Sequence, residues 1–201
     1  MGVLYLQRDE TFFCDEHAPL CVTKTLGVPY LPQGAELPTD DNGDPLRLLF
    51  QLNLDECEPT ECLPETGILQ IFVSDTVEDS DNYDRSAVCV RFYDHVDYDT
   101  EEPEGLFLAE ADNAFGLMEC RYEEGDGDDG LTVGGELDLY ELSADAFDVV
   151  EHYPEYGYPL LCISAEEQPY SNGGRVCYFL VDEQELKTRD IHRVTVLFDE
   201  I

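Results

Sequence analysis

The sequence contains few basic residues. Ten lysines and arginines stand against 47 aspartates and glutamates, the formal net charge is −37, and only Lys24 and Lys187 are lysines. A negative field of this size repels phosphate backbones and anionic membranes, so we expect neither nucleic acid nor a membrane as partner. It favours a basic protein or a cation. The alternative is that the charge serves only solubility, or suits a salty cytoplasm.

Long apolar runs and a secretory leader are also missing. No apolar run approaches the ~18 residues that a membrane-spanning helix needs. The N-terminal MGVLYLQRDE has no basic residues before its apolar patch and no small residues typical of a cleavage site. We therefore expect a cytoplasmic protein.

Recognisable catalytic motifs are absent as well. The chain has no G-x-S-x-G elbow, no P-loop, no H-E-x-x-H and no G-x-G-x-x-G. The four histidines lie far apart, without a nucleophile at a telling spacing; they are His17, His95, His152 and His192. The sequence therefore indicates no catalytic residues and no cofactor, and it favours a protein that is not an enzyme.

Eight cysteines are present, but no secretion signal accompanies them, so we expect buried thiols and not a disulfide scaffold. Apolar neighbours place Cys89, Cys162 and Cys177 in the predicted core.

Two segments contain residue types that bind zinc or calcium. Cys14-x-x-His17-x-x-x-Cys21, together with Cys57 and Cys62, offers soft ligands for zinc, yet neither spacing is a C-x-x-C knuckle, which favours unliganded thiols. The segment EGDGDDGLTVGGE lacks glycine where a calcium loop requires it and is predicted to be a solvated acidic loop.

Apolar residues make up 43% of the chain and occur in blocks, which predicts one folded domain over residues 1–201. The blocks predict strands within 3–7, 46–54, 66–74, 86–94, 159–164, 175–181 and 192–198. Helices are predicted in 139–153, with Ser143 as N-cap, and in DEQEL (182–186). The prolines and glycines of 27–45 predict an ordered, turn-rich loop.

The two ends of the chain show a weak internal repeat, formed by residues 45–74 and 159–181. In each, an apolar run leads through a connector to a glycine, with a phenylalanine five residues beyond it. The alignment places Cys162 opposite Gln51. It predicts two strand pairs in pseudo-symmetric positions.

Gln51 and Asn53 fall on the same face of the predicted strand 46–54, among leucines. One interpretation is structural: buried amides need partners, and backbone groups of the 27–45 loop could supply them. The other is functional, with the two amides as polar anchors of a ligand pocket whose wall is Tyr30 or Tyr158.

Two acidic segments are the candidates for contact with a basic partner, because such charges raise the association rate and the specificity of binding. Their residues are Asp97, Asp99, Glu101 and Glu102 in one segment, and Glu123, Glu124, Asp126, Asp128 and Asp129 in the other.

GVPYLPQGAELPTDDNGDPLRLLFQLNLDE, followed by LPETGILQIFV, resembles the N-terminal signature of the YwqG-like family of bacterial proteins, a domain of unknown function. GGRVCYFLVDEQELKTRDIHRVTVLF is similar to the family's closing segment, with its Arg189-Asp190 pair. The resemblance covers about residues 27–75 and 157–199. It implies an α+β, strand-dominated fold. We expect a mostly antiparallel sheet with a few short helices.

The resemblance implies no established catalytic activity. Members of the family occur beside toxin genes, which implies that some are immunity proteins. Our preferred hypothesis is therefore a non-enzymatic cytoplasmic binding protein, the immunity partner of a basic toxin. The rival hypothesis is a small-ligand or metal-binding domain.

Overall fold

The structure is a computed structural model of the chain. It describes residues 2–8, 19–60, 63–74, 87–103, 115–124, 130–135, 137, 139, 142–152, 157–164 and 175–200. The strands within these ranges are β1 (Gly2–Arg8), β2 (Lys24–Leu26), β3 (Arg47–Asn53), β4 (Ile68–Val73), β5 (Val88–Tyr93), β6 (Phe115–Glu124), β7 (Leu131–Gly134), β8 (Tyr158–Ile163), β9 (Arg175–Val181) and β10 (Thr195–Glu200). The helices are the 3-10 helix η1 (Leu54–Glu56) and the α-helices α2 (Ala144–His152) and α3 (Glu183–Thr188).

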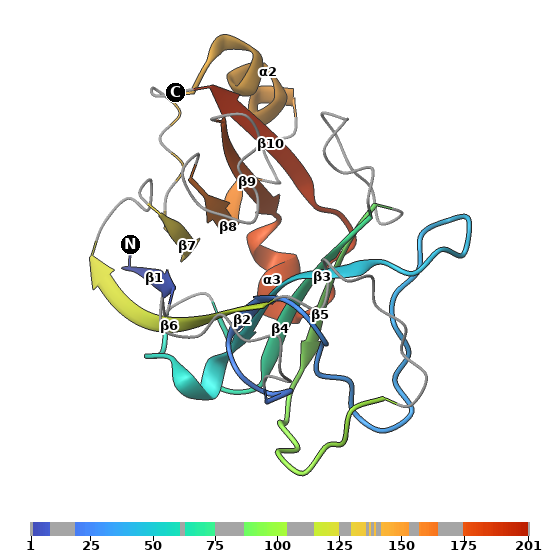
Figure 1. The fold of residues 1–201 in the computed structure, drawn as a ribbon. Coiled ribbons are helices and arrows are strands. Elements are labelled where there is room, and N and C mark those ends of the chain that lie inside the picture. Colours follow the sequence, from blue (N-terminus) through green and yellow to red (C-terminus); the bar gives the residue numbers. More distant parts are fainter. Residues whose placement is uncertain are drawn as a thin grey trace.

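The strands follow the order β10-β9-β8-β7-β1-β6-β2-β3-β4-β5. Neighbouring strands in this order are antiparallel. β6 joins the two halves of the order, because its residues 115–117 pair with β2 and its residues 118–124 pair with β1. Figure 1 shows β6 as the long curved strand that passes from β2 toward β1. The predicted strand-dominated fold with short helices is confirmed.

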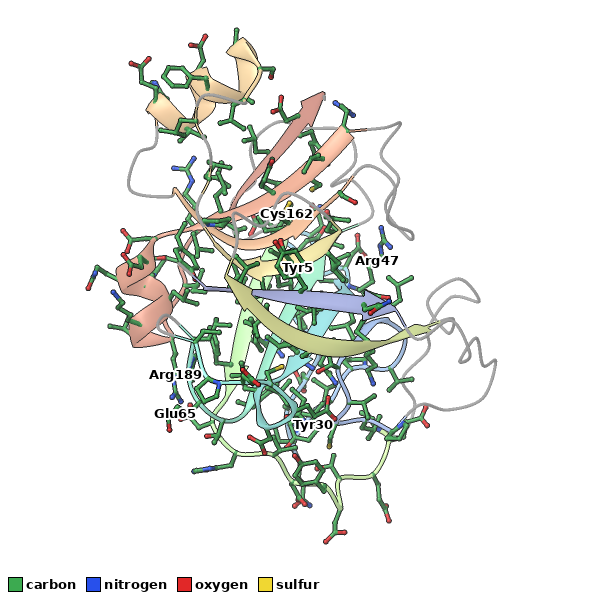
Figure 2. The ribbon with its side chains drawn as sticks, turned by 90° about the vertical axis from the view of Figure 1, so that its left-hand side faces the viewer. Tyr5, Tyr30, Arg47, Glu65, Cys162 and Arg189 are labelled. Carbon is green, nitrogen blue, oxygen red and sulfur yellow. The ribbon has the colours of Figure 1, made fainter. Side chains whose placement is uncertain are left out.

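The main core lies where the hairpins β3–β4 and β8–β9 turn their apolar faces toward each other. Phe50, Ile71, Leu161 and Phe179 belong to one buried cluster, which Leu186 of α3 joins. Alternation along antiparallel strands sends every second side chain to this core, while the remaining side chains form the outer faces of the hairpins. Cys162 and Tyr30 belong to two further buried clusters, and Figure 2 shows these residues well apart.

Both hairpins contain one irregularity at a matching place. The register of β3 against β4 shifts at Leu49, between Leu48 and Phe50. The register of β8 against β9 shifts at Leu160, between Pro159 and Leu161. The predicted alignment of Gln51 with Cys162 agrees with these positions. Pseudo-symmetry of the two halves stays a prediction.

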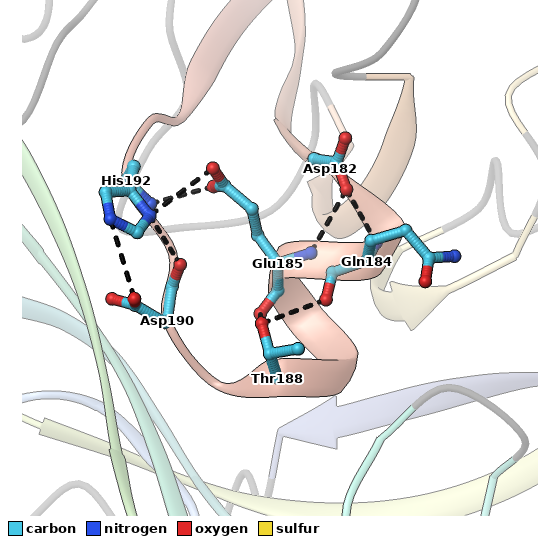
Figure 3. A network of polar contacts seen from close by, with 6 residues as sticks. All are labelled: Asp182, Gln184, Glu185, Thr188, Asp190 and His192. Carbon is cyan, nitrogen blue, oxygen red and sulfur yellow. Dashed lines mark hydrogen bonds and ion pairs between the residues drawn. The ribbon is translucent and has the colours of Figure 1, made fainter.

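Both predicted helices are present, and α2 begins after its predicted N-cap, Ser143. The Ser143 hydroxyl accepts a hydrogen bond from Ala146 N at 3.3 Å, at the start of α2. The Asp182 carboxylate caps α3 and accepts hydrogen bonds from the backbone N–H groups of Gln184 and Glu185, at 2.6 and 3.1 Å (Figure 3). Each cap satisfies N–H groups that have no partner inside their helix.

Gly67 allows the chain to turn from η1 into β4. Its φ of +105° lies in a region that other residues rarely adopt, and a Cβ atom built there would lie 2.1 Å from the carbonyl oxygen of Tyr93. The glycine of the Leu-Pro-x-x-Gly turn is therefore required by both the backbone conformation and the close approach of β5.

Cys162 and Cys177 are buried, as expected, and burial raises the pKa of the Cys177 thiol. The prediction that Cys89 is a core residue was wrong: the side chain is only half-buried, because it lies on β5, the last strand of the order. In the part of the chain that the structure describes, no helix is long and apolar enough to cross a membrane.

Candidate functional site

A buried hydrogen-bond network begins at Gln51 on β3. Its Oε1 accepts hydrogen bonds from Tyr30 N at 2.9 Å and from Gln70 Nε2 at 2.7 Å. Its Nε2 donates to the carbonyl oxygens of Leu20 and Val22, at 2.7 and 2.8 Å. All four hydrogen-bonding positions of the buried amide are used within the protein. This geometry supports the structural interpretation of Gln51, and its role in ligand binding stays a prediction.

Tyr30 connects this network to the first acidic segment. Its side chain is buried, and its hydroxyl accepts a hydrogen bond from Asp97 N at 3.0 Å and donates to the carbonyl of His95 at 3.5 Å. The ring packs edge-to-face against Tyr93, with centroids 5.5 Å apart. The Cys21 thiol adds a long contact of 3.6 Å to the carbonyl of Asp97. Buried groups therefore fix the backbone of the segment.

Asn53 positions an exposed aromatic ring. Its Nδ2 donates to the Tyr98 hydroxyl at 3.4 Å, and that hydroxyl donates to Asp55 Oδ2 at 3.0 Å. The hydrogen bond from Asn53 lowers the pKa of Tyr98. Burial of the hydroxyl and the Asp55 carboxylate together raise this pKa by more than Asn53 lowers it, so the net shift is upward. The ring itself is 63% exposed, the highest value among the described large hydrophobic side chains. Its oxygen is held while its faces stay open to a partner.

Carboxylates lie beside Tyr98, from η1 and from its own segment. We name this surface the acidic face and define it as Tyr98 with Asp55, Glu56, Asp97, Asp99, Glu101 and Glu102. The six acidic side chains are exposed. Asp97 Oδ1 accepts a hydrogen bond from Asp99 N at 3.1 Å, which fixes the turn that carries Tyr98. The four residues predicted in this segment thus lie together, and η1 adds two carboxylates that sequence reasoning missed.

The second predicted acidic segment is less fully described. Glu123 and Glu124 lie at the end of β6, opposite Val3 and Gly2 of β1. Asp126, Asp128 and Asp129 lie outside the described residues. Their role in partner binding stays a prediction.

Tyr158 belongs to a different part of the molecule. It is the first residue of β8 and packs against the main core cluster. Tyr30 belongs to a separate buried cluster with Cys21 and Ile68. The two tyrosines that were predicted as alternative walls of one pocket therefore lie in different clusters.

No group of three or more metal-ligating side chains occurs among the described residues. Of the residues considered for zinc, Cys14, His17 and Cys62 lie outside the described ranges. Cys57 instead pairs with Cys120 on β6, with the two sulfur atoms 2.7 Å apart. The Cys57 S–H donates to Cys120, which lowers the pKa of Cys120 and raises that of Cys57.

A comparison with protein-family models matches residues 23–164 to a domain of unknown function, DUF1963. The match covers more than half of the chain. The chain belongs to the DUF1963 family. The DUF1963 match spans Gln51, Tyr30 and the acidic face, whereas β9, α3 and β10 follow it in the chain. No curated protein matches the chain. The narrower resemblance to YwqG-like proteins stays a prediction.

Proposed function

We propose that this DUF1963 protein is a non-enzymatic cytoplasmic binding protein that recognises a basic protein through the acidic face. We favour the more specific proposal that the basic partner is a toxin and that this protein confers immunity to it. One observation carries the proposal: the exposed Tyr98 ring is held among carboxylates by hydrogen bonds from Asn53 and to Asp55.

The composition of the acidic face suits a basic partner. Tyrosine is enriched among the residues that dominate binding energy at protein interfaces. An exposed ring also attracts an arginine or lysine placed over its face, by about 0.5–1 kcal/mol at exposed sites. The surrounding carboxylates would steer a positively charged protein toward the ring and reject acidic competitors.

The acidic face is organised before any partner arrives. Tyr30 fixes Asp97 from within the core, and Asn53 fixes Tyr98. Association normally costs free energy because loops and side chains lose freedom at the interface. A segment whose backbone is already held loses less, which favours tight binding by a small surface.

The test is retention of a basic protein from a lysate of the native host, with three immobilised proteins compared. The first is the wild type. The second neutralises the acidic face by Asp97→Asn, Asp99→Asn, Glu101→Gln and Glu102→Gln. The third loses the same number of charges at exposed positions outside the acidic face, by Asp41→Asn, Asp44→Asn, Asp148→Asn and Glu151→Gln.

We expect one basic protein in stoichiometric amount on the wild type and on the third variant, and none on the second. Salt of about 0.5 M should release it, because screening shortens the range of the attraction. Tyr98→Ala should weaken the purified complex roughly tenfold, since the ring supplies contact as well as charge complementarity. Equal loss by the second and third variants would indicate ion exchange without a specific face. The immunity form of the proposal requires that co-expression with the protein relieves toxicity of the retained partner.

A further inference from the structure

A cavity of about 380 Å³ lies along β5, beside the connector of residues 189–194 that leads from α3 to β10. Pro38 and Thr39 of the loop before β3 close another side. The volume falls within the range typical of small-molecule sites. None of the residues of the acidic face lines it.

Positive charge is concentrated in this cavity. Its lining includes Arg91, Arg189 and Arg193, three of the eight arginines of a chain whose net charge is −37. His192 lies beside them. The three arginines come from β5, from the end of α3 and from the connector, so the fold brings them to one cavity from separate elements.

Two of the arginines are held in defined places. Arg91 lies over the ring of Phe72, with its guanidinium carbon 5.7 Å from the ring centroid, and its Nη1 donates to the carbonyl of Glu36. Arg189 ends α3 in the left-handed conformation, with φ of 60°, and its Nη1 forms an ion pair with Asp94. A left-handed conformation is unfavourable for a residue with a Cβ atom, and the hydrogen bonds from Arg189 N to the carbonyls of Glu185 and Leu186 stabilise it at this helix end.

The connector is fixed by the network in Figure 3. His192 N donates to Glu185 Oε2 at 2.8 Å, and the imidazole Nδ1 lies 3.4 Å from Glu185 Oε1. The imidazole Nε2 lies 3.5 Å from the Asp190 carboxylate, which also lines the cavity. These contacts tie the connector to α3 and set the course of the chain between Arg189 and Arg193.

We propose that this cavity binds a small organic anion with a carboxylate or phosphate group. Planar guanidinium groups recognise the oxygens of such groups in pairs. Among the described residues, Arg91 and Arg189 each bond to one protein acceptor through Nη1. Because a guanidinium has five N–H donors in all, this one contact does not use its full capacity to bond an anion. Val88, Val90 and Val194 supply apolar wall for the body of the ligand. This site is independent of the acidic face.

Asp94 is the internal competitor for this anion. Its carboxylate pairs with Arg189, as the carboxylate or phosphate of a ligand would. Asp94→Asn removes the competitor and one negative charge beside the cavity. It should therefore strengthen anion binding, whereas loss of Arg189 should weaken it.

The probes are benzoate, phenyl phosphate and neutral benzamide, each titrated into the isotope-labelled full chain in a buffer without phosphate or other polyanions. Amide resonances of residues 88–91 and 190–194 report occupancy of the cavity. We expect benzoate or phenyl phosphate to shift these resonances saturably and benzamide to leave them unchanged. The tighter of the two anions identifies the preferred group.

Arg189→Gln should weaken the bound anion about tenfold, the loss expected for a charge-assisted hydrogen bond. Asp94→Asn should tighten it several-fold. The matched control is Lys187→Gln, which removes a positive charge from the same helix without altering the cavity lining; it should leave affinity within about twofold. The proposal fails if neither anion shifts the reporting resonances, if benzamide binds as well, or if Lys187→Gln and Arg189→Gln weaken binding equally. If Arg189→Gln impairs folding, Asp94→Asn decides the outcome.

Discussion

The hairpins β3–β4 and β8–β9 differ most on their outer faces. In the first, Gln51 lies opposite Gln70. In the second, Cys162 lies opposite Tyr178 at the corresponding place. Both hairpins send their other face into the same core. One fold therefore supports a polar outer face on one hairpin and a mainly apolar outer face on the other.

The segments that pack over the two outer faces also differ. We call the segments over Gln51 the polar cover and the helix over Cys162 the apolar cover. Gln51 is covered by the irregular segments on either side of β2, residues 19–23 and 27–46, whose backbone N–H and C=O groups bond to the amide. Cys162 is covered by α2, whose Ala146 and Val150 join its buried cluster. A helix uses its backbone groups internally, so it suits an apolar face, whereas irregular chain must find partners for its own polar groups. The polar cover also reaches the acidic face, through Tyr30.

The largest effect is expected from Gln51→Leu. The substitution leaves Tyr30 N and the carbonyl of Val22 without their amide partner, whereas the carbonyl of Leu20 keeps its hydrogen bond from Lys24. Each buried group left unsatisfied costs about 1–3 kcal/mol. We expect a loss of about 4 kcal/mol in the free energy of unfolding, measured with urea. Cys162→Ala, at the corresponding place of the other hairpin, should cost about 1–2 kcal/mol. Equal losses would mean that the two covers do not differ as described.

The next effect concerns Lys24, which is buried under the polar cover and donates to the carbonyls of Pro19 and Leu20 at 3.3 and 3.2 Å. Burial lowers its pKa from 10.5 to about 8. At neutral pH the lysine is protonated in both states, and burial of the charge costs the folded protein about 3 kcal/mol. Between about pH 8 and pH 10.5 the unfolded chain binds more protons, so stability rises with pH through this group and the cost disappears.

Lys24→Met should therefore gain stability relative to the wild type at neutral pH, and this gain should shrink by about 3 kcal/mol as the pH approaches 10.5. Urea denaturation of both proteins at several pH values measures the difference, so that titration of other groups cancels. A difference that does not change with pH would show that the lysine titrates normally.

The smallest effect is expected from Val150→Ala in the apolar cover. The lost packing against the cluster of Cys162 should cost about 1–2 kcal/mol. Native-state hydrogen exchange should show faster exchange in α2, with the protection of Tyr30 and Asp97 amides unchanged, because the covers lie on different hairpins. Equal acceleration in both places would mean that the covers open together.

Local patterns in the sequence predicted most of the long strands and the start of α2 at Ser143, but β6, the longest described strand, was not among the predicted strands. Apolar runs such as 46–54 and 66–74 mark strands because both of their faces are buried. The short strands β2 and β7 were not predicted, since three or four residues carry too little pattern, and β2 contains the buried Lys24. Tyr98 stood between two predicted aspartates and was overlooked. Its hydroxyl is held by a hydrogen bond to Asp55, which is 43 residues away.

The sequence by itself determined the negative charge, the strand-rich fold and the caps at Ser143 and Asp182. These features depend on composition or on neighbours a few residues apart. Only the tertiary structure decided that the Gln51 amide bonds to the covering chain, that Asn53 holds Tyr98, and that three arginines share one cavity. Each of these arrangements includes residues from segments that are far apart along the chain, such as Arg91 and Arg189, and strand order and register bring the segments together.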